Sequence, residues 1–222
     1  ADYAHVEKEL LDEKYRNYTE NYWGKRDFSP SSLIFYLGID VKVDNLIHHN
    51  LFFDEDIDLF SNDIYVNKTW PKKPLFYASC PSKTDKSTAP NGKENIFLLM
   101  PLPAGVKDTE ELREKYFNII LQKLEKYCKM DIKSKIIYKR SYCVNDFKKD
   151  YYSYKGNAYG LANTVSQTAN LKPKIYNKNV KNLFYTGQLT VPGPGVPPSL
   201  ISGKLVADYI IKNCKWKSKK IY

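Results

Sequence analysis

The sequence predicts an α+β fold, and three observations support this prediction. The chain has 222 residues, of which 42% are hydrophobic and 14% aromatic, enough for one large folded domain or two small ones. Strand-like and helix-like segments mix along the chain without a repeated β-α-β unit, which is typical of α+β proteins. The sequence also contains no internal repeat and no low-complexity tract, so repeat architectures are excluded.

The first half of the chain predicts one short helix and then four strands. Residues 4–13 (AHVEKELLDE) have the amphipathic pattern of a short helix. Four later segments are rich in β-branched and aromatic residues and are predicted as strands: 32–40, 46–53, 74–80 and 95–102. Between the last two, Pro81, Pro90 and Asn91-Gly92 indicate a long turn.

The second half contains the clearest helix, over residues 109–128. Thr109 is placed to cap it, and apolar residues recur at helical spacing on one face: Leu112, Tyr116, Ile119, Ile120, Leu124 and Tyr127. Residues 135–144 alternate as a strand, and residues 161–171 (LANTVSQTANL) predict a helix that Pro173 terminates.

The formal net charge is +10, and it is +5 without the five lysines near the C-terminus, which are Lys212, Lys215, Lys217, Lys219 and Lys220. A basic end beside Trp216 and Tyr222 is typical of a solvated tail, or of a segment that rests on an anionic membrane surface or on nucleic acid. No nucleic-acid motif is present, so no such partner is predicted. No apolar run approaches the roughly 18–20 residues that span a bilayer. We therefore expect a cytoplasmic protein that meets a membrane, if at all, from one side.

The cysteines and histidines predict no metal site and no assigned catalytic residue. Cys80, Cys128, Cys143 and Cys214 are widely spaced without a CxxC pair, which favours free, mostly buried thiols. His48 and His49 are adjacent in a predicted strand, where neighbouring side chains point to opposite faces. We expect one at the surface and the other partly buried, so that they cannot address one site.

The end of the chain carries the clearest chemical signal. Residues 180–187 predict a short buried strand that ends at Gly187, followed by the loop QLTVPGPGVPP and an amphipathic helix with Pro198 in its first turn. Gly193 and Gly195 let the backbone approach a ligand closely, and the prolines fix the shape of the loop. The helix start is expected to present unpaired N–H groups to a planar, electron-rich ligand. An ordinary strand–turn–helix with a rigid turn gives the same pattern, and both interpretations stay open.

This segment, NLFYTGQLTVPGPGVPPSLISGKLVAD, resembles the C-terminal signature of bacterial-type phytoene desaturases, which are carotenoid desaturases of the FAD-dependent amine-oxidase-like superfamily. Four further segments agree in the same order: ADYAHVEKELL, SPSSLIFYLGID, FYASCPSKTDKSTAPNGKENIFLLMPLP and YKGNAYGLANTVSQTANLKPK. The likeness therefore covers nearly the whole chain. It implies part of a mixed-sheet substrate domain together with the C-terminal strand–loop–helix of an FAD-binding, Rossmann-like domain.

The resemblance implies a division of the chain into four segments. Residues 1–27 would end an FAD-domain segment and form a connector, and residues 28–140 would supply the substrate-domain sheet and helix. Residues 141–174 would form a connector and helix near the flavin, and residues 175–222 the C-terminal FAD-binding segment. The family's GxGxxG fingerprint is absent from the sequence. The chain is therefore expected to be a C-terminal portion that needs a missing N-terminal FAD-binding half and is inactive alone.

The resemblance also implies an activity and a set of site residues. FAD would accept a hydride from a carotenoid precursor such as phytoene, an apolar polyene. The FAD-binding positions would be Gly187, Gln188, Gly193, Gly195, Val196 and Pro197. The expected substrate-lining residues are Phe35, Leu37 and Tyr159. Gln188 stands where the superfamily often has an acidic residue, which puts a carboxylate–ribityl contact in doubt.

Two alternatives to this function remain. The first is another carotenoid-modifying flavoprotein, such as an isomerase, a ketolase or a later-step desaturase. The second belongs to a different class and is a non-catalytic basic module that binds a membrane or nucleic acid.

Overall fold

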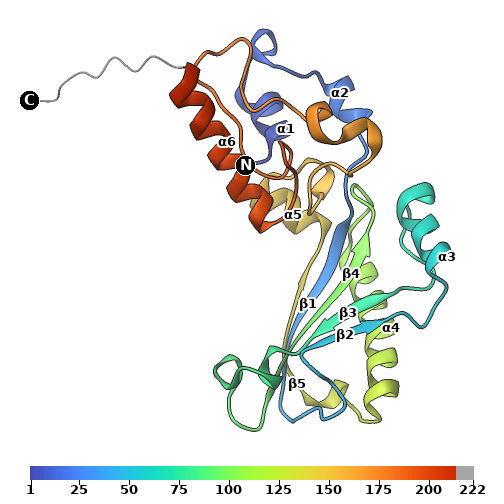
Figure 1. Ribbon diagram of the computed structural model, residues 1–222. Helices are drawn as coiled ribbons and strands as arrows, with labels where there is room; N and C mark the ends of the chain where they lie inside the picture. The colour runs from blue at the N-terminus through green and yellow to red at the C-terminus, as the bar shows by residue number, and fades with distance from the viewer. Residues whose placement is uncertain (214–222) are drawn as a thin grey trace, which may run out of the picture. The chain divides into compact units, whose positions relative to one another are not determined.

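The structure, a computed structural model, describes residues 1–213, which form two compact units (Figure 1). Unit 1 comprises Ala1–Ser29, Tyr152–Tyr154 and the chain from Tyr159 onward, and unit 2 comprises Pro30–Tyr151 and Lys155–Ala158. The basic end beyond Asn213 lies outside the described residues, together with Cys214, Trp216 and Tyr222. Among the helices that the structure describes, none combines the length and the apolar character needed to cross a membrane.

Unit 2 is built on a five-stranded sheet. Its strands are β1 (Ser31–Ile39), β2 (His49–Phe52), β3 (Phe76–Ser79), β4 (Glu94–Leu102) and β5 (Ile136–Tyr142), in the spatial order β2-β3-β4-β1-β5. Ser31 lies opposite Leu102, and β1 pairs with β4 over its whole length. The α+β prediction is confirmed, and the expected mixed sheet is antiparallel at every pairing of its described strands.

One face of this sheet packs against the long helix α4 (Glu110–Cys128), as Figure 1 shows. Side chains alternate between the faces of a strand, so every second residue of β1 enters the core. These residues are Leu33, Phe35, Leu37 and Ile39. Thr109 caps α4 as predicted, because its hydroxyl accepts a hydrogen bond from the Leu112 N–H at 3.4 Å.

The apolar face predicted for α4 was only partly correct. Tyr116, Ile120 and Leu124 are buried, whereas Tyr127 is 52% exposed. The buried face also includes residues that were not predicted, namely Phe117, Leu121 and Cys128. The helix is therefore turned so that a wider apolar stripe faces the sheet.

A buried ion pair joins the start of α4 to α5 (Val144–Tyr151). Both oxygens of the fully buried Asp108 carboxylate accept hydrogen bonds from Arg113, each at 2.7 Å. The Asn145 N–H donates to the same carboxylate at 2.8 Å. Burial acts to raise the pKa of Asp108, but the hydrogen bonds from Arg113 and Asn145 outweigh it and hold this pKa below its usual range. The remaining helical elements of unit 2 are α3 (Ile57–Ser61), a π-helix (Asn62–Asn67) and 3₁₀ turns at Pro81–Lys83, Lys86–Thr88 and Lys133–Lys135. A further 3₁₀ turn, Tyr154–Gly156, lies where the chain passes from unit 1 back to unit 2.

Unit 1 consists of short helices and irregular chain around an aromatic core. Its helices are α1 (Tyr3–His5), a π-helix (Val6–Leu10), a 3₁₀ turn (Glu13–Tyr15), α2 (Glu20–Gly24) and α6 (Val196–Asn213). The rings of Tyr3 and Tyr185 stack with centroids 3.6 Å apart. Beneath them the buried Glu7 carboxylate accepts a hydrogen bond from the Tyr185 hydroxyl at 2.6 Å and one from the Tyr18 N–H at 2.8 Å. This buried network ties the first residues of the chain to the segment near Tyr185.

Three predicted elements of unit 1 were wrong or incomplete. The helix predicted over 4–13 ends at Leu10 and consists of one α-helical turn followed by one π-helical turn. Residues 180–187 form no strand, but a turn closed by a single bridge between Tyr176 and Phe184. Residues 161–171 form two 3₁₀ turns, Val165–Gln167 and Ala169–Leu171, instead of a helix. Tertiary hydrogen bonds explain the last difference, because the Gln167 amide exchanges hydrogen bonds of 3.0 and 2.8 Å with the backbone of Asp27.

Candidate functional site

The loop that precedes α6 has a backbone conformation that requires glycine. Its three glycines have positive φ angles: +99° at Gly187, +136° at Gly193 and +112° at Gly195. Residues with a β-carbon rarely adopt such angles. A β-carbon at Gly187 would meet no atom within 4 Å, so the side of the loop at Gly187 is open to a ligand.

Hydrogen bonds fix this loop to the first turns of α6. The Gly187 N–H donates to the hydroxyl of Ser202 at 2.8 Å, and Ser202 is fully buried. The hydroxyl of Ser202 in turn donates to the Ser199 carbonyl at 2.6 Å. The N–H and the hydroxyl of buried Thr190 both donate to the Gly187 carbonyl, at 3.0 and 2.9 Å. The shape of the loop is therefore set by the protein itself, before any ligand binds.

The helix start offers fewer hydrogen-bond donors than the sequence suggested. The helix α6 begins at Val196, so Pro197 and Pro198 occupy its second and third positions and carry no N–H. The Ser199 N–H already donates to the Gly195 carbonyl at 3.0 Å. Of the first three residues of α6, Val196 alone has an N–H group. The expected array of unpaired N–H groups was wrong, and the helix start contributes fewer donors to this loop than the sequence suggested.

A buried lysine lies beside this loop. Lys172 is 3% exposed, and among residues 1–213 its buried Nζ has no hydrogen-bond partner. Burial lowers the pKa of Lys172. A β-carbon at Gly193 would lie 3.2 Å from Cε and 3.4 Å from Nζ of Lys172, and 3.8 Å from Oδ1 of Asn163. The sequence prediction missed Lys172, because no local pattern around it indicates that its side chain is buried.

The residues of this loop fit a flavin. The backbone at Gly187 has no atom in the way of a planar ring. Gly193 is buried and packs against the Lys172 side chain, whose amine has no hydrogen-bond partner among the described residues. Gln188 packs in the opposite direction: a β-carbon at Gly160 would lie 2.8 Å from the Gln188 carbonyl oxygen. Val196 and Pro197 are exposed beside the glycines. The predicted FAD-binding residues therefore lie together on one loop, and Lys172 joins them from an earlier segment.

The predicted substrate-lining residues lie in different environments. Phe35 is fully buried, with its ring centroid 4.8 Å from that of Phe117 in α4. Leu37 is 2% exposed in the same core, and Tyr159 of unit 1 is 50% exposed. Between the two core residues, Tyr36 points to the other face of the sheet and is 41% exposed.

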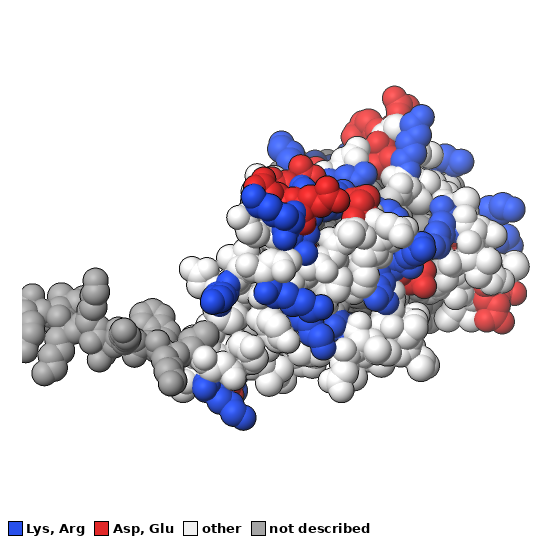
Figure 2. Space-filling model, turned by 90° about the horizontal axis from the view of Figure 1, so that it is seen from above, with Lys and Arg blue, Asp and Glu red and all other residues white. Residues whose placement is uncertain are grey.

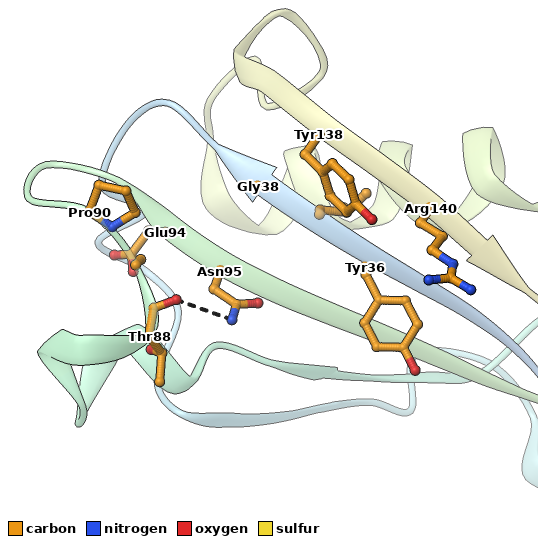
Figure 3. A pocket seen from close by; sticks show the side chains of 10 residues that line it. Tyr36, Gly38, Thr88, Pro90, Glu94, Asn95, Tyr138 and Arg140 are labelled. Atoms are coloured by element: carbon orange, nitrogen blue, oxygen red, sulfur yellow. Dashed lines mark hydrogen bonds between the residues drawn. The ribbon is translucent and has the colours of Figure 1, made fainter.

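This other face of the sheet carries a shallow hollow of about 480 Å³ (Figure 3). Tyr36 of β1 lies opposite Arg140 of β5, and Tyr138 lies further along the same strand. The floor continues to Asn95 of β4, whose amide donates to the Thr88 carbonyl at 3.4 Å. Aromatic rings and one guanidinium thus frame an open surface on unit 2.

The two histidines form no catalytic pair with a third group. Their ring centroids lie 4.2 Å apart, because β2 begins only at His49 and the alternation of a strand does not extend to His48. The expectation that they diverge was therefore wrong, whereas their burial, one half-buried and one exposed, is as predicted. His48 Nδ1 contacts the Thr84 hydroxyl, and His49 Nδ1 contacts the Tyr77 hydroxyl, each at 2.6 Å.

The surface charge of the described residues is mixed in sign. Acidic and basic side chains lie beside one another on the face shown in Figure 2. Several form ion pairs, including Lys8 with Glu20 and Lys93 with Asp40, each at 2.7 Å. Such exposed pairs contribute little to stability.

Comparison with known proteins gives two informative relatives. No family model matches the chain. The chain is 39% identical over 213 residues to the carotenoid 3,4-desaturase of Haloarcula japonica, covering 96% of this chain and 43% of that protein. It is 32% identical over 223 residues to a 4,4'-diapophytoene desaturase (4,4'-diaponeurosporene-forming) of Staphylococcus aureus strain Newman, covering 96% of this chain and 44% of that protein. The chain therefore spans less than half the length of these curated relatives.

Proposed function

Because this chain belongs to the carotenoid desaturase family and spans less than half the length of its relatives, we propose that the complete protein containing it is an FAD-dependent oxidoreductase. Its proposed substrate is a carotenoid precursor such as phytoene. The match to two carotenoid desaturases over 96% of the chain is the observation that carries this proposal. Bound FAD would supply the electron acceptor, and the protein would orient the polyene and exclude water.

Within this function, we assign the loop from Gly187 to Pro197 to one edge of the flavin. The open backbone at Gly187 and the hydrogen bonds that fix the loop support this assignment. The sequence has no GxGxxG fingerprint, so another part of the complete protein would hold the adenosine diphosphate half of FAD. The chain by itself is then expected to be inactive.

The exposed face of the sheet is the proposed surface for the polyene. Tyr36 and Phe97 lie in contact there, with ring centroids 5.5 Å apart. Leu99 of β4 lies next to Tyr77 of β3 on the same face. An almost fully apolar substrate gains about 25 cal/mol for each Å² that it buries on such a surface. A polyene of this kind dissolves in lipid, and for this reason we also propose that the protein works at the cytoplasmic face of a membrane.

Product analysis in carotenoid-producing cells tests the proposed activity. The complete protein would be expressed in cells that accumulate phytoene, and the carotenoids would be separated and identified by absorption and mass. Loss of hydrogen in pairs, with absorption moving to longer wavelength, is the expected result. Unchanged phytoene, in cells where the protein is folded and loaded with FAD, would refute phytoene as the substrate.

A later-step desaturase is the second candidate. The relative with 39% identity is named as a carotenoid 3,4-desaturase, which favours a substrate that is already conjugated. Cells that accumulate such a carotenoid, compared with cells that accumulate phytoene, distinguish the two. The same mass measurement distinguishes the other alternative activities, because an isomerase leaves the number of hydrogen atoms unchanged and a ketolase adds oxygen. A non-catalytic basic module would give no product in either strain and would bind a polyanion column with a steep salt dependence.

A further inference from the structure

The starting point is the burial of Lys172 without a counter-charge. Lysine is rarely fully buried in proteins unless it is paired. Its Nζ is inaccessible to solvent and has no hydrogen-bond partner, although the residue lies in a loop-rich part of unit 1. A buried ammonium without a partner among the described residues destabilises the fold, because nothing there offsets the desolvation of its charge. A ligand that brings negative charge would remove this penalty.

The geometry shows where such a ligand would bind. The end of the Lys172 side chain packs directly against Gly193, the glycine with the most extreme positive φ in the loop. Gly193 is itself buried, and the Lys172 amine lies beside the place that a side chain at Gly193 would occupy. Asn163 Oδ1 lies 3.8 Å from a β-carbon placed at Gly193 and is the next polar side-chain atom there after Nζ of Lys172.

The start of α6 offers few N–H donors, so it can do little by itself to attract an anion to this loop. An 18-residue helix such as α6 normally attracts an anion through its first N–H groups and its dipole. Here Pro197 and Pro198 remove two of the first three N–H groups. The dipole of α6 therefore acts together with the amine of Lys172, which is the fixed cation that the structure places beside this loop.

We propose that Lys172 is the residue that stabilises negative charge on the flavin ring at the Gly187–Pro197 loop. This inference rests on the proposed function, in which the flavin meets this loop. Reduction of a flavin places negative charge on its pyrimidine ring, and a nearby ammonium stabilises that charge. Lys172 would thus favour the reduced form of the cofactor. It is a binding residue that sets the redox potential, and it transfers no proton or hydride itself.

The test uses the complete protein, purified with FAD, and four variants. Lys172→Met removes the charge at similar length, Lys172→Gln removes it but stays polar, and Lys172→Arg keeps it. Lys174→Met is the matched control, because Lys174 is exposed only two residues away. The measurements are the midpoint potential of the flavin and its affinity for sulfite, which adds to the ring and leaves negative charge on the pyrimidine.

The expected result is specific to position 172. Lys172→Met and Lys172→Gln weaken sulfite binding by about tenfold or more and lower the potential by about 30 mV or more, the equivalent of tenfold for a two-electron couple. Lys172→Arg retains both properties in large part, and Lys174→Met matches the wild type. Without FAD, Lys172→Met melts at a higher temperature than the wild type, because an unpaired buried charge has been removed.

Three results would overturn the inference. One is an unchanged potential and sulfite affinity in both uncharged variants. Another is a loss of FAD affinity while the bound flavin keeps its potential, which would assign Lys172 to the diphosphate of FAD instead. The third is a lower melting temperature of FAD-free Lys172→Met. If the wild-type complete protein binds no FAD at all, it is the proposed function that fails, and this outcome is seen before any variant is made.

Discussion

Two neighbouring residues of β1 give a sharp test of how unit 2 is built. Phe35 faces α4 and is fully buried, whereas Tyr36 faces the hollow on the other side of the sheet. Replacing Phe35 by Ala leaves a cavity beside Phe117, and such Phe→Ala changes cost about 3–5 kcal/mol. Replacing Tyr36 by Ala removes mainly its cross-strand contact with Phe97, worth about 0.2–1 kcal/mol.

Urea denaturation, followed by circular dichroism, measures both changes. With a slope of about 1–3 kcal/mol per M, Phe35→Ala is expected to lower the midpoint by about 1 M or more. Tyr36→Ala is expected to shift it by well under that amount. Amide hydrogen exchange of β1 and β4 reports the unfolding of unit 2 separately from that of unit 1. Equal shifts for the two variants, or a larger shift for Tyr36→Ala, would refute the assignment of the two faces.

Three further predictions concern the site loop, the buried ion pair and the thiols. Gly193→Ala is expected to destabilise unit 1 by about 1–3 kcal/mol and to reduce FAD content, because a φ of +136° is strained for alanine and the added carbon lies only 3.2 Å from the Lys172 side chain; Gly24→Ala, which meets no atom within 4 Å, is the control in a thermal melt. Arg113→Ala is expected to cost about 3–5 kcal/mol at neutral pH, because it leaves the Asp108 carboxylate buried and unpaired. The pKa of Asp108 is lowered on folding, so its contribution is present above about pH 4 and is lost as the pH falls through the folded pKa; Asp108→Asn should lack this acid-dependent step in melts recorded from pH 7 to pH 2. Burial raises the pKa of the three described thiols, to about 11 at Cys128 and about 12 at Cys143, so iodoacetamide should label the following cysteines only after unfolding: Cys80, Cys128 and Cys143.

The sequence predicted the parts of the fold that depend on local patterns. The strands of unit 2 and the start of α4 at Thr109 follow from runs of β-branched residues and from a capping side chain, and both signals act within a few residues. The segment 161–171 was misassigned because the Gln167 side chain binds the backbone of Asp27, 140 residues away. No local pattern reports a contact at such a separation.

The candidate site shows the same limit. The glycines at Gly187 and Gly193 could be identified because their type restricts the backbone around them. Phe35 was predicted to line the substrate, and the structure places it in the core against Phe117; the alternation of a strand predicts two faces but not which of them is covered. Lys172 could not be identified as part of the site, since its burial depends on how the loop from Gly187 folds back over it.

The division of the chain has a consequence for how it is made. Unit 2 begins and ends at one place, where the Ala158 N–H donates to the Pro30 carbonyl at 3.3 Å. During synthesis its strands leave the ribosome before residue 159 does, so the sheet can form while unit 1 is still incomplete. The hydrogen bond between Tyr185 and Glu7 spans 178 positions. Once unit 2 has folded, the flexible chain between these two residues is only about a quarter as long. The entropic cost of bringing them together, expressed as free energy, is then lower by roughly 1 kcal/mol. A folded unit 2 therefore makes it easier for the first residues of the chain to pack against the segment near Tyr185.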